Sequence, residues 1–170
     1  MTLLVQYTLI FASVLALVAL GGCFSEHSGV INIGLEGIMV MGALGGALAM
    51  KFIPASTPGI VLFILIVLTS VLVGMVFSLF LGVAAIHFNA DQTLVGTALN
   101  LMGTAAAVVI VRAINVAENP DNVSSTVVYR QAKQVFLVKI GDFEFNWFML
   151  LVVLAIIASH VVLYKTKFGL

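Results

Sequence analysis

The chain has 170 residues, of which 62% are hydrophobic and only 8% are charged, and its mean hydropathy is +1.25. Soluble domains carry about 25% charged residues because a folded protein in water needs a solvated surface. Seven basic and seven acidic residues are too few for a soluble fold of this size. The formal net charge of zero gives no indication of a nucleic-acid partner. The composition is that of a membrane protein.

The first expected element is a membrane span from Leu3 to about Leu20. Residues 1–25 contain no Asp, Glu, Lys or Arg, and roughly 20 apolar residues are enough for a helix to cross the hydrocarbon core. Cys23 follows this run, as in a bacterial lipoprotein signal. However, the first ten residues lack the basic side chain of a secretory signal. We therefore interpret Cys23 as a small apolar residue near the end of the span.

A glycine-rich segment, GGCFSEHSGVINIGLEG, separates the first two spans. Asn32 and Glu36 are four residues apart and so share one helical face, and Gly34 and Gly37 interrupt the helix beside them. Transporters use broken helices to build polar sites inside the bilayer. Residues 29–37 therefore predict a break or a re-entrant entry to the second span, with Asn32 and Glu36 as candidates for the substrate pathway. The open alternative is that Glu36 only caps the span in a hydrated loop.

Small residues form a stripe along the second span, which ends at Phe52. Gly42 and Gly46 form a G-x-x-x-G pair and Ala49 extends it. Small side chains let helix backbones approach closely in lipid. The stripe predicts a helix-packing face on a side of the span different from that of Glu36.

The third and fourth spans are expected at residues 60–86 and 93–111, and the third is about 40 Å long if it is fully helical. That length exceeds the hydrocarbon core, so we expect the third span to tilt or bend. In the fourth span, Asn100 has Thr97 and Thr104 on its face. An amide in hydrocarbon needs partners, either in a neighbouring helix or in a hydrated cavity. These three residues are candidates for the pathway, and bonding between helices is the open alternative.

More than half of the charged residues fall between Arg112 and Glu144, which marks residues 112–146 as a loop outside the membrane. The fifth span is expected at Trp147–Tyr164, with an aromatic residue at each end, as at membrane interfaces. The predicted fold class is all-α: a polytopic transmembrane helical bundle of about five spans. The sequence contains no metal-ligand cluster, catalytic triad or phosphate-binding glycine loop. We expect no catalytic residue, no metal and no other cofactor.

Three motifs occur in order along the chain: GGCFSEHSGVINIGLEGIMVMGAL, ADQTLVGTALNLMG and LYKTKFGL. Together they resemble the permease subunits of bacterial ABC importers for branched-chain amino acids, ribose and nucleosides. The resemblance is strongest to the nucleoside branch linked to basic membrane proteins, and to the second of its two paired permeases. His27 stands where that branch commonly has Arg. Members of the family continue past FGL into an ATPase-docking loop and further spans, so residues 1–170 are expected to form the N-terminal portion of a single transmembrane permease domain.

The resemblance implies a subunit of the bacterial cell membrane that forms part of the translocation pathway for nucleosides or a related small polar solute. It implies four kinds of contact: the lipid bilayer, a second, paired permease, a cytoplasmic ABC ATPase and an extracellular substrate-binding lipoprotein. Alternatives remain open. The chain could be a fragment of a secondary carrier or channel, with Glu36 as the ion-coupling acid, or a membrane scaffold. It could also be an ABC permease for a free sugar or an amino acid.

The resemblance also implies an orientation, in which the N-terminus and residues 112–146 lie outside and the C-terminus is cytoplasmic. Counting basic residues favours the reverse, because cytoplasmic loops usually carry the excess of Lys and Arg. In the implied orientation the inside has Lys165 and Lys167, while the outside has Lys51, Arg112, Arg130, Lys133 and Lys139. We expect the implied orientation, because the later half of such permeases normally supplies the cytoplasmic basic residues.

Overall fold

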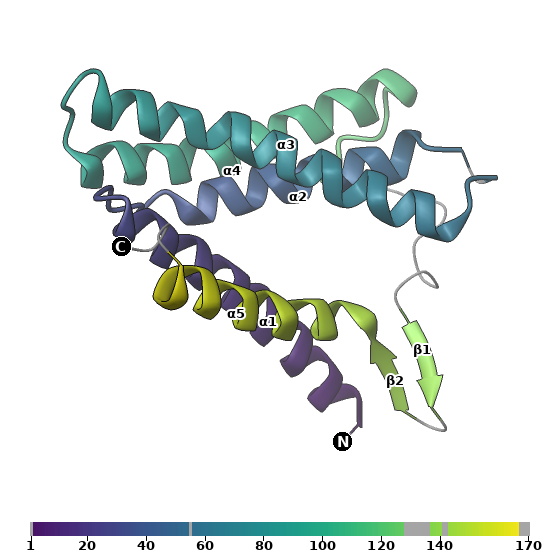
Figure 1. Cartoon of the computed structure of the whole chain (residues 1–170). Helices are drawn as coiled ribbons and strands as arrows, with labels where there is room; N and C mark the ends of the chain where they lie inside the picture. Colours follow the sequence, from purple (N-terminus) through teal and green to yellow (C-terminus); the bar gives the residue numbers. More distant parts are fainter. Residues whose placement is uncertain (1, 55, 128–136, 141–142, 167–170) are drawn as a thin grey trace. The chain divides into compact units, whose positions relative to one another are not determined.

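The computed structural model describes residues 2–54, 56–127, 137–140 and 143–166 (Figure 1). Within these residues, five helices are long and apolar enough to cross a membrane, which confirms the predicted helical class. The chain divides into two compact units, Met1–Ile31 with Lys133–Leu170, and Asn32–Ala132. The elements are α1 (Thr2–His27), α2 (Leu35–Phe52), α3 (Gly59–Ile86), α4 (Gln92–Glu118), β1 (Leu137–Ile140), β2 (Phe143–Asn146) and α5 (Trp147–Lys165).

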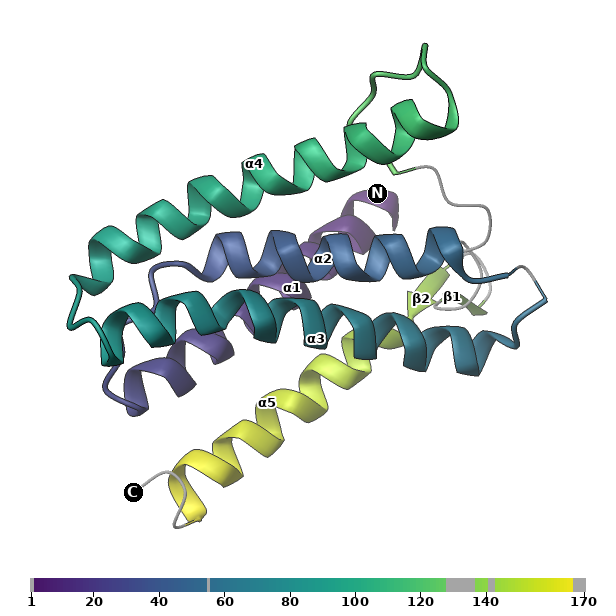
Figure 2. The same cartoon turned by 90° about the horizontal axis from the view of Figure 1, so that it is seen from above.

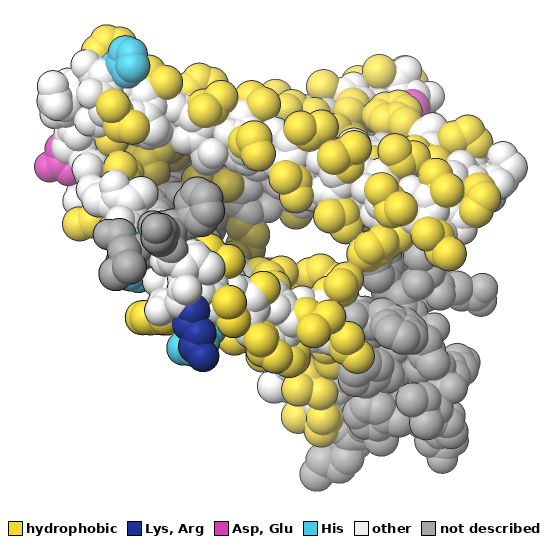
Figure 3. All heavy atoms as spheres, in the orientation of Figure 1, with side chains coloured by type: hydrophobic (Ala, Val, Ile, Leu, Met, Phe, Trp, Pro, Cys, Tyr) yellow, Lys and Arg dark blue, Asp and Glu magenta, His cyan; other side chains and the backbone are white. Residues whose placement is uncertain are grey.

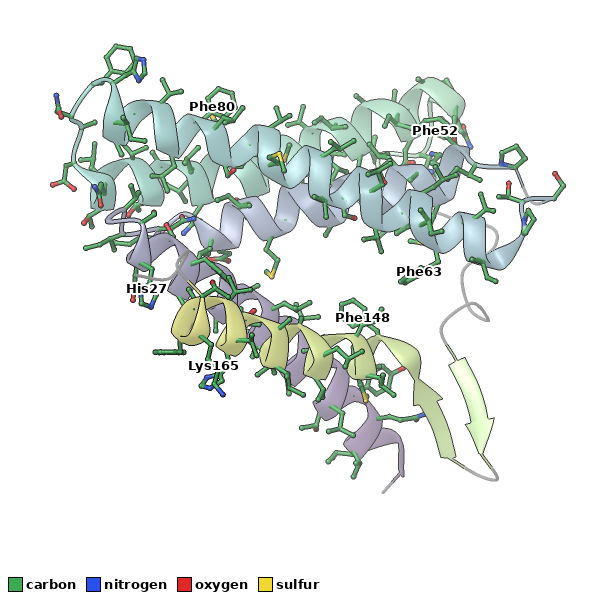
Figure 4. The ribbon with its side chains drawn as sticks, in the orientation of Figure 1. His27, Phe52, Phe63, Phe80, Phe148 and Lys165 are labelled. Carbon is green, nitrogen blue, oxygen red and sulfur yellow. The ribbon has the colours of Figure 1, made fainter. Side chains whose placement is uncertain are left out.

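The unit Asn32–Ala132 is built around α2. This helix packs against both α3 and α4, and Figure 2 shows one of them on each side of it. Most apolar side chains remain exposed, including Phe52 and Phe80 (Figure 4), as expected for helices whose solvent is lipid. In Figure 3 hydrophobic side chains are spread along the visible helices, and few charged side chains are seen. The buried hydrophobic residues of the unit are Leu44, Leu62, Phe77, Leu81, Leu99 and Val111.

The other unit contains α1, α5 and a two-stranded antiparallel hairpin. In the hairpin, Leu137 pairs with Asn146 and Ile140 with Phe143. The helix α1 packs against α5, and the His27 and Tyr164 rings meet edge to face with centroids 6.4 Å apart. Because both residues lie at the C-terminal ends of their helices, α1 and α5 run in the same direction, as the first and fifth of five alternating spans must.

Two helices extend further than the hydrophobic runs predicted. The first span was expected to end near Leu20 but continues to His27, and the fourth was expected to end at Val111 but continues to Glu118. A charged residue ends an apolar run without ending the backbone hydrogen-bond pattern. What ends α4 is Pro120, because the residue before a proline is disfavoured in the helical region, and Asn119 is extended.

The predicted loop after the fourth span is therefore partly structured. Its first residues belong to α4, and the hairpin β1–β2 leads directly into α5. Residues 119–127 follow α4 without helix or strand, residues 128–136 and 141–142 of the predicted loop lie outside the described residues, and so does the FGL motif at 168–170. The prediction that residues 1–170 form one membrane domain stays a prediction.

Candidate functional site: the entry to α2

The predicted break between the first two spans is present. Helix α1 ends at His27 and α2 begins at Leu35, and Gly29 has a φ of +83°, in the left-handed region that favours glycine. The break is shorter than predicted, because Gly37 lies inside α2, at its third position. Gly34 is the N-cap of α2 and has no side chain that could accept a bond from the first turn.

Asn100 of α4 supplies the missing cap from a neighbouring helix. Its Oδ1 accepts a hydrogen bond from the backbone N–H of Gly37 at 2.7 Å, and its Nδ2 donates to the backbone carbonyl of Ile33 at 2.9 Å. An N-cap side chain normally satisfies the N–H at this third position. Asn100 performs that task in place of Gly34 and holds the residue before the cap as well. One amide thus fixes both sides of the start of α2.

Close contact between glycines brings the two backbones into reach of this amide. A Cβ on Gly96 would lie 2.9 Å from the nitrogen of Gly34, and a Cβ on Gly103 would lie 2.8 Å from the carbonyl oxygen of Gly37. A Cβ on Gly37 would meet the Leu99 carbonyl and approach the backbone of the next residue within 2.9 Å. Backbone atoms cannot shift aside as the end of a flexible side chain can, so Gly37, Gly96 and Gly103 all favour glycine strongly. Gly96, Asn100 and Gly103 recur at i, i+4 and i+7, so this face was visible in GTALNLMG but was not predicted as a contact.

The two polar residues expected at the break differ in their surroundings. The Oδ1 of Asn32 is buried and has no hydrogen-bond partner among the described residues. It lies 3.4 Å from the position that a Cβ on Gly34 would take, beside the start of α2. Glu36 is exposed in the first turn of the helix. The alternative that Glu36 caps the span gains no support, since its carboxylate makes no hydrogen bond to a backbone N–H in the described part of the chain, and the N–H of Gly37 is bonded by Asn100 instead.

The two threonines beside Asn100 bond within their own helix. Thr97 donates its hydroxyl proton to the Thr93 carbonyl at 2.8 Å, and Thr104 donates to the carbonyls of Asn100 and Leu101 at 3.0 Å. Neither hydroxyl bonds the Asn100 side chain. The face that we predicted as one polar stripe thus has a bridging amide in the middle and two hydroxyls bonded within α4 on either side.

The small-residue stripe of α2 lies against α3. A Cβ on Gly42 would lie 3.2 Å from the Ser70 carbonyl, and one on Gly46 would lie 3.3 Å from Ile66 Cγ2. The nearest atom to a Cβ on Gly46 would be Ser70 Oγ, and Gly45, which the G-x-x-x-G pattern does not include, is also close to α3, with Val73 Cγ2 at 2.8 Å from such a Cβ. Ala49, the third residue of the expected stripe, is half-buried. Helix α2 therefore meets α3 through one set of glycines and α4 through another.

The charge near the site is negative. Glu36 lies in the first turn of α2, where the helix dipole favours an anion. Among the described residues no group of three His, Cys, Asp or Glu side chains could hold a metal ion. The arrangement can hold a broken backbone in a defined shape and present a buried amide oxygen, an exposed carboxylate and backbone groups beside it.

The five spans make this chain a multi-pass membrane protein. It belongs to the family described as branched-chain amino acid transport system / permease component, whose model matches residues 4–170. The chain is 36% identical to the guanosine ABC transporter permease protein NupQ of Bacillus subtilis, over 100% of this chain and 54% of the relative. It is 32% identical to the nucleoside ABC transporter permease protein NupC of Lactococcus lactis, over 99% of this chain and 54% of the relative.

The chain thus spans about half the length of these relatives. The predicted resemblance to nucleoside permeases is confirmed. No solved structure matches the chain.

Proposed function

We propose that this chain is the N-terminal portion of the membrane-spanning permease of an ABC importer, and that it forms part of the pathway for nucleosides. The observation that carries the proposal is the match to two nucleoside permeases over essentially the whole chain. The family match over residues 4–170 and the five spans support it. In this proposal the permease catalyses no reaction and a separate cytoplasmic ATPase hydrolyses ATP. A second, paired permease and an extracellular substrate-binding lipoprotein complete the importer in a bacterial cell membrane.

The proposed orientation has the N-terminus and residues 112–146 outside and the C-terminus in the cytoplasm. The alternation of five spans then places the turn after α2 and the end of α4 outside. It places the break at residues 28–34 and the turn between α3 and α4 inside. The ion pair between Lys51 and Glu118, 2.9 Å apart, supports a common side of the membrane for the end of α2 and the end of α4, and it would form equally in the reverse orientation.

Within the proposed permease, Asn100 acts as a positioning residue. Its bonds to Gly37 and Ile33 support this role, since both of its polar atoms are used to shape the break. Asn32 and Glu36 are the proposed pathway residues, because the first has an unpaired buried oxygen and the second an exposed carboxylate beside the same break. Thr97 and Thr104 remain pathway candidates with their oxygen lone pairs available to a solute.

Uptake by cells that express the full-length permease with its partner subunits tests the function. We expect uptake of radiolabelled guanosine, competition by an excess of other nucleosides and no competition by ribose or leucine. Competition by ribose or leucine but not by nucleosides would assign the permease to one of the alternative substrates.

The energy source separates an ABC importer from a secondary carrier. A variant of the partner ATPase that binds but cannot hydrolyse ATP should abolish uptake, while dissipation of the proton gradient at constant cellular ATP should not. The opposite pair of results would identify a carrier.

A further inference from the structure

A second polar cluster lies at the opposite end of α2 from the break. The side chain of Lys51, in the last turn of α2, is only 10% exposed, and its Nζ lies 2.9 Å from Oε2 of Glu118, which is 57% exposed. The same ammonium group donates a hydrogen bond to Oδ1 of Asn115 at 3.3 Å. Glu118 and Asn115 both belong to α4. A largely buried lysine of α2 is therefore held by two side chains of α4.

Asn115 extends this cluster into the chain that follows α4. It is 2% exposed, and its Nδ2 donates to the backbone carbonyls of Ser124 and Thr126, each at 3.0 Å. Because Lys51 takes the oxygen of the amide and residues 124–126 take the nitrogen, every polar atom of this side chain is bonded. A buried amide with all its partners holds its neighbours in one arrangement.

The two clusters fix α2 to α4 at both ends. Gly37, bonded to Asn100, and Lys51 are 14 residues apart, which is about 21 Å along a helix. A helix held to its neighbour at one point can pivot about that point, whereas one held at two distant points cannot. Between these points the other face of α2 packs tightly on α3 through Gly42, Gly45 and Gly46.

We propose that Lys51, Asn115 and Glu118 are positioning residues for transport, which clamp the end of α2 to α4 so that the two helices move as one body. This inference rests on the proposed function, because it assigns the clamp a role in a transport cycle. Conformational change in transporters is largely the movement of rigid helical units against one another. The clamp keeps the α2–α4 contact inside one such unit, and the shape of the break is then preserved in every state.

Charge substitutions in the full-length complex give the first test. Lys51→Met removes the ammonium group, keeps the length of the side chain and leaves no unpaired buried cation. We expect the maximal uptake rate to fall roughly 2- to 30-fold, the range of coupling effects for residues that touch no ligand, with the KM for guanosine and the membrane abundance unchanged. Arg112→Met is the matched control, because it removes an exposed positive charge from α4 and should not alter uptake.

A reversible cross-link gives the decisive test. Cysteines replace Lys51 and Glu118 in a background that carries Cys23→Ser, and a bifunctional methanethiosulfonate reagent bridges them, because its spacer takes the place of the two long native side chains. A monofunctional reagent of the same kind is the control for modification without bridging. Before bridging, the ion pair is absent and uptake should be reduced. The bridge should restore uptake, and a reductant should reverse that gain.

Two results would overturn the proposal. If the bridge blocks uptake that the unbridged protein performs, α2 and α4 must separate during transport. If bridged, unbridged and monofunctionally modified proteins all take up guanosine at the rate of the Cys23→Ser parent, the cluster has no positioning role. A parent that takes up no nucleoside would instead refute the proposed function, and the yield of the cross-link in that protein would still report whether the two helix ends stay together.

Discussion

Replacement of Asn100 by leucine should lower the stability of the folded permease, because it removes the two hydrogen bonds that hold the start of α2 to α4. Leucine has a similar volume but leaves the N–H of Gly37 and the carbonyl of Ile33 without the partners that now bond them at 2.7 and 2.9 Å. Side-chain hydrogen bonds between membrane helices contribute about 0.6 kcal/mol on average and up to about 1.7. Two such bonds give a destabilisation of about 1–3 kcal/mol for Asn100→Leu.

The assay is the apparent melting temperature of the purified full-length complex, read by size-exclusion chromatography after heating, together with membrane abundance by immunoblot. Thr97→Val is the matched control, because the Thr97 hydroxyl bonds only a carbonyl of its own helix. We expect Asn100→Leu to melt several degrees below that control and to be less abundant. Equal melting temperatures and equal abundance would refute the capping argument, and a loss of uptake with both unchanged would place Asn100 in the pathway.

Three further predictions follow from the same unit. Gly37→Ala should prevent assembly, because its Cβ would meet the backbone of α4. Gly82→Ala is the control and should be neutral or slightly stabilising, because no atom lies within 4 Å of its Cβ. Equal membrane abundance of the two variants would contradict the close contact at Gly37. A cysteine at Val123, which is 68% exposed, should react with an impermeant thiol reagent in whole cells that carry Cys23→Ser, and labelling only after permeabilisation would show the reverse orientation. Glu36→Gln and Glu36→Ala should both reach the membrane normally, because the carboxylate makes no bond among the described residues. Lower uptake by both variants would support a pathway role for Glu36. Reduced membrane abundance of Glu36→Ala alone would support a structural role.

The sequence was sufficient to predict the five spans because hydrophobic runs and charge-free stretches reflect the solvent of each segment. It was less informative about helix ends. Arg112 ended the predicted fourth span although α4 passes through it. Asp91 is exposed in the turn before α4 and caps this helix by accepting bonds from the N–H groups of Thr93 and Leu94, a role that was not predicted. Caps depend on a few local bonds that a hydropathy pattern does not record.

The candidate site was predicted only in part, for a different reason. The polar residues Asn32, Glu36 and Asn100 were recognisable because polar groups are rare in these spans. The bonds of Asn100 to a segment more than 60 residues earlier depend on which helices meet. Lys51 was only counted among the basic residues outside the membrane, and its burial against Asn115 follows only from the packing of α2 on α4.

Because α2 and α3 differ in length, the thickness of the surrounding lipid bilayer should affect the structure of the permease. An 18-residue helix is about 27 Å long and a 28-residue helix about 42 Å, although the two pack side by side. A membrane with short acyl chains matches α2 and leaves the ends of α3 outside the hydrocarbon core, whereas long acyl chains match α3 and submerge the ends of α2. In long-chain lipid the segment before α2 is drawn below the headgroups, where water no longer reaches its backbone. The hydrogen bonds of Asn100 to Gly37 and Ile33 should then contribute more to stability as the acyl chains lengthen. Lipid composition would thus change the stability of the break through these few atoms.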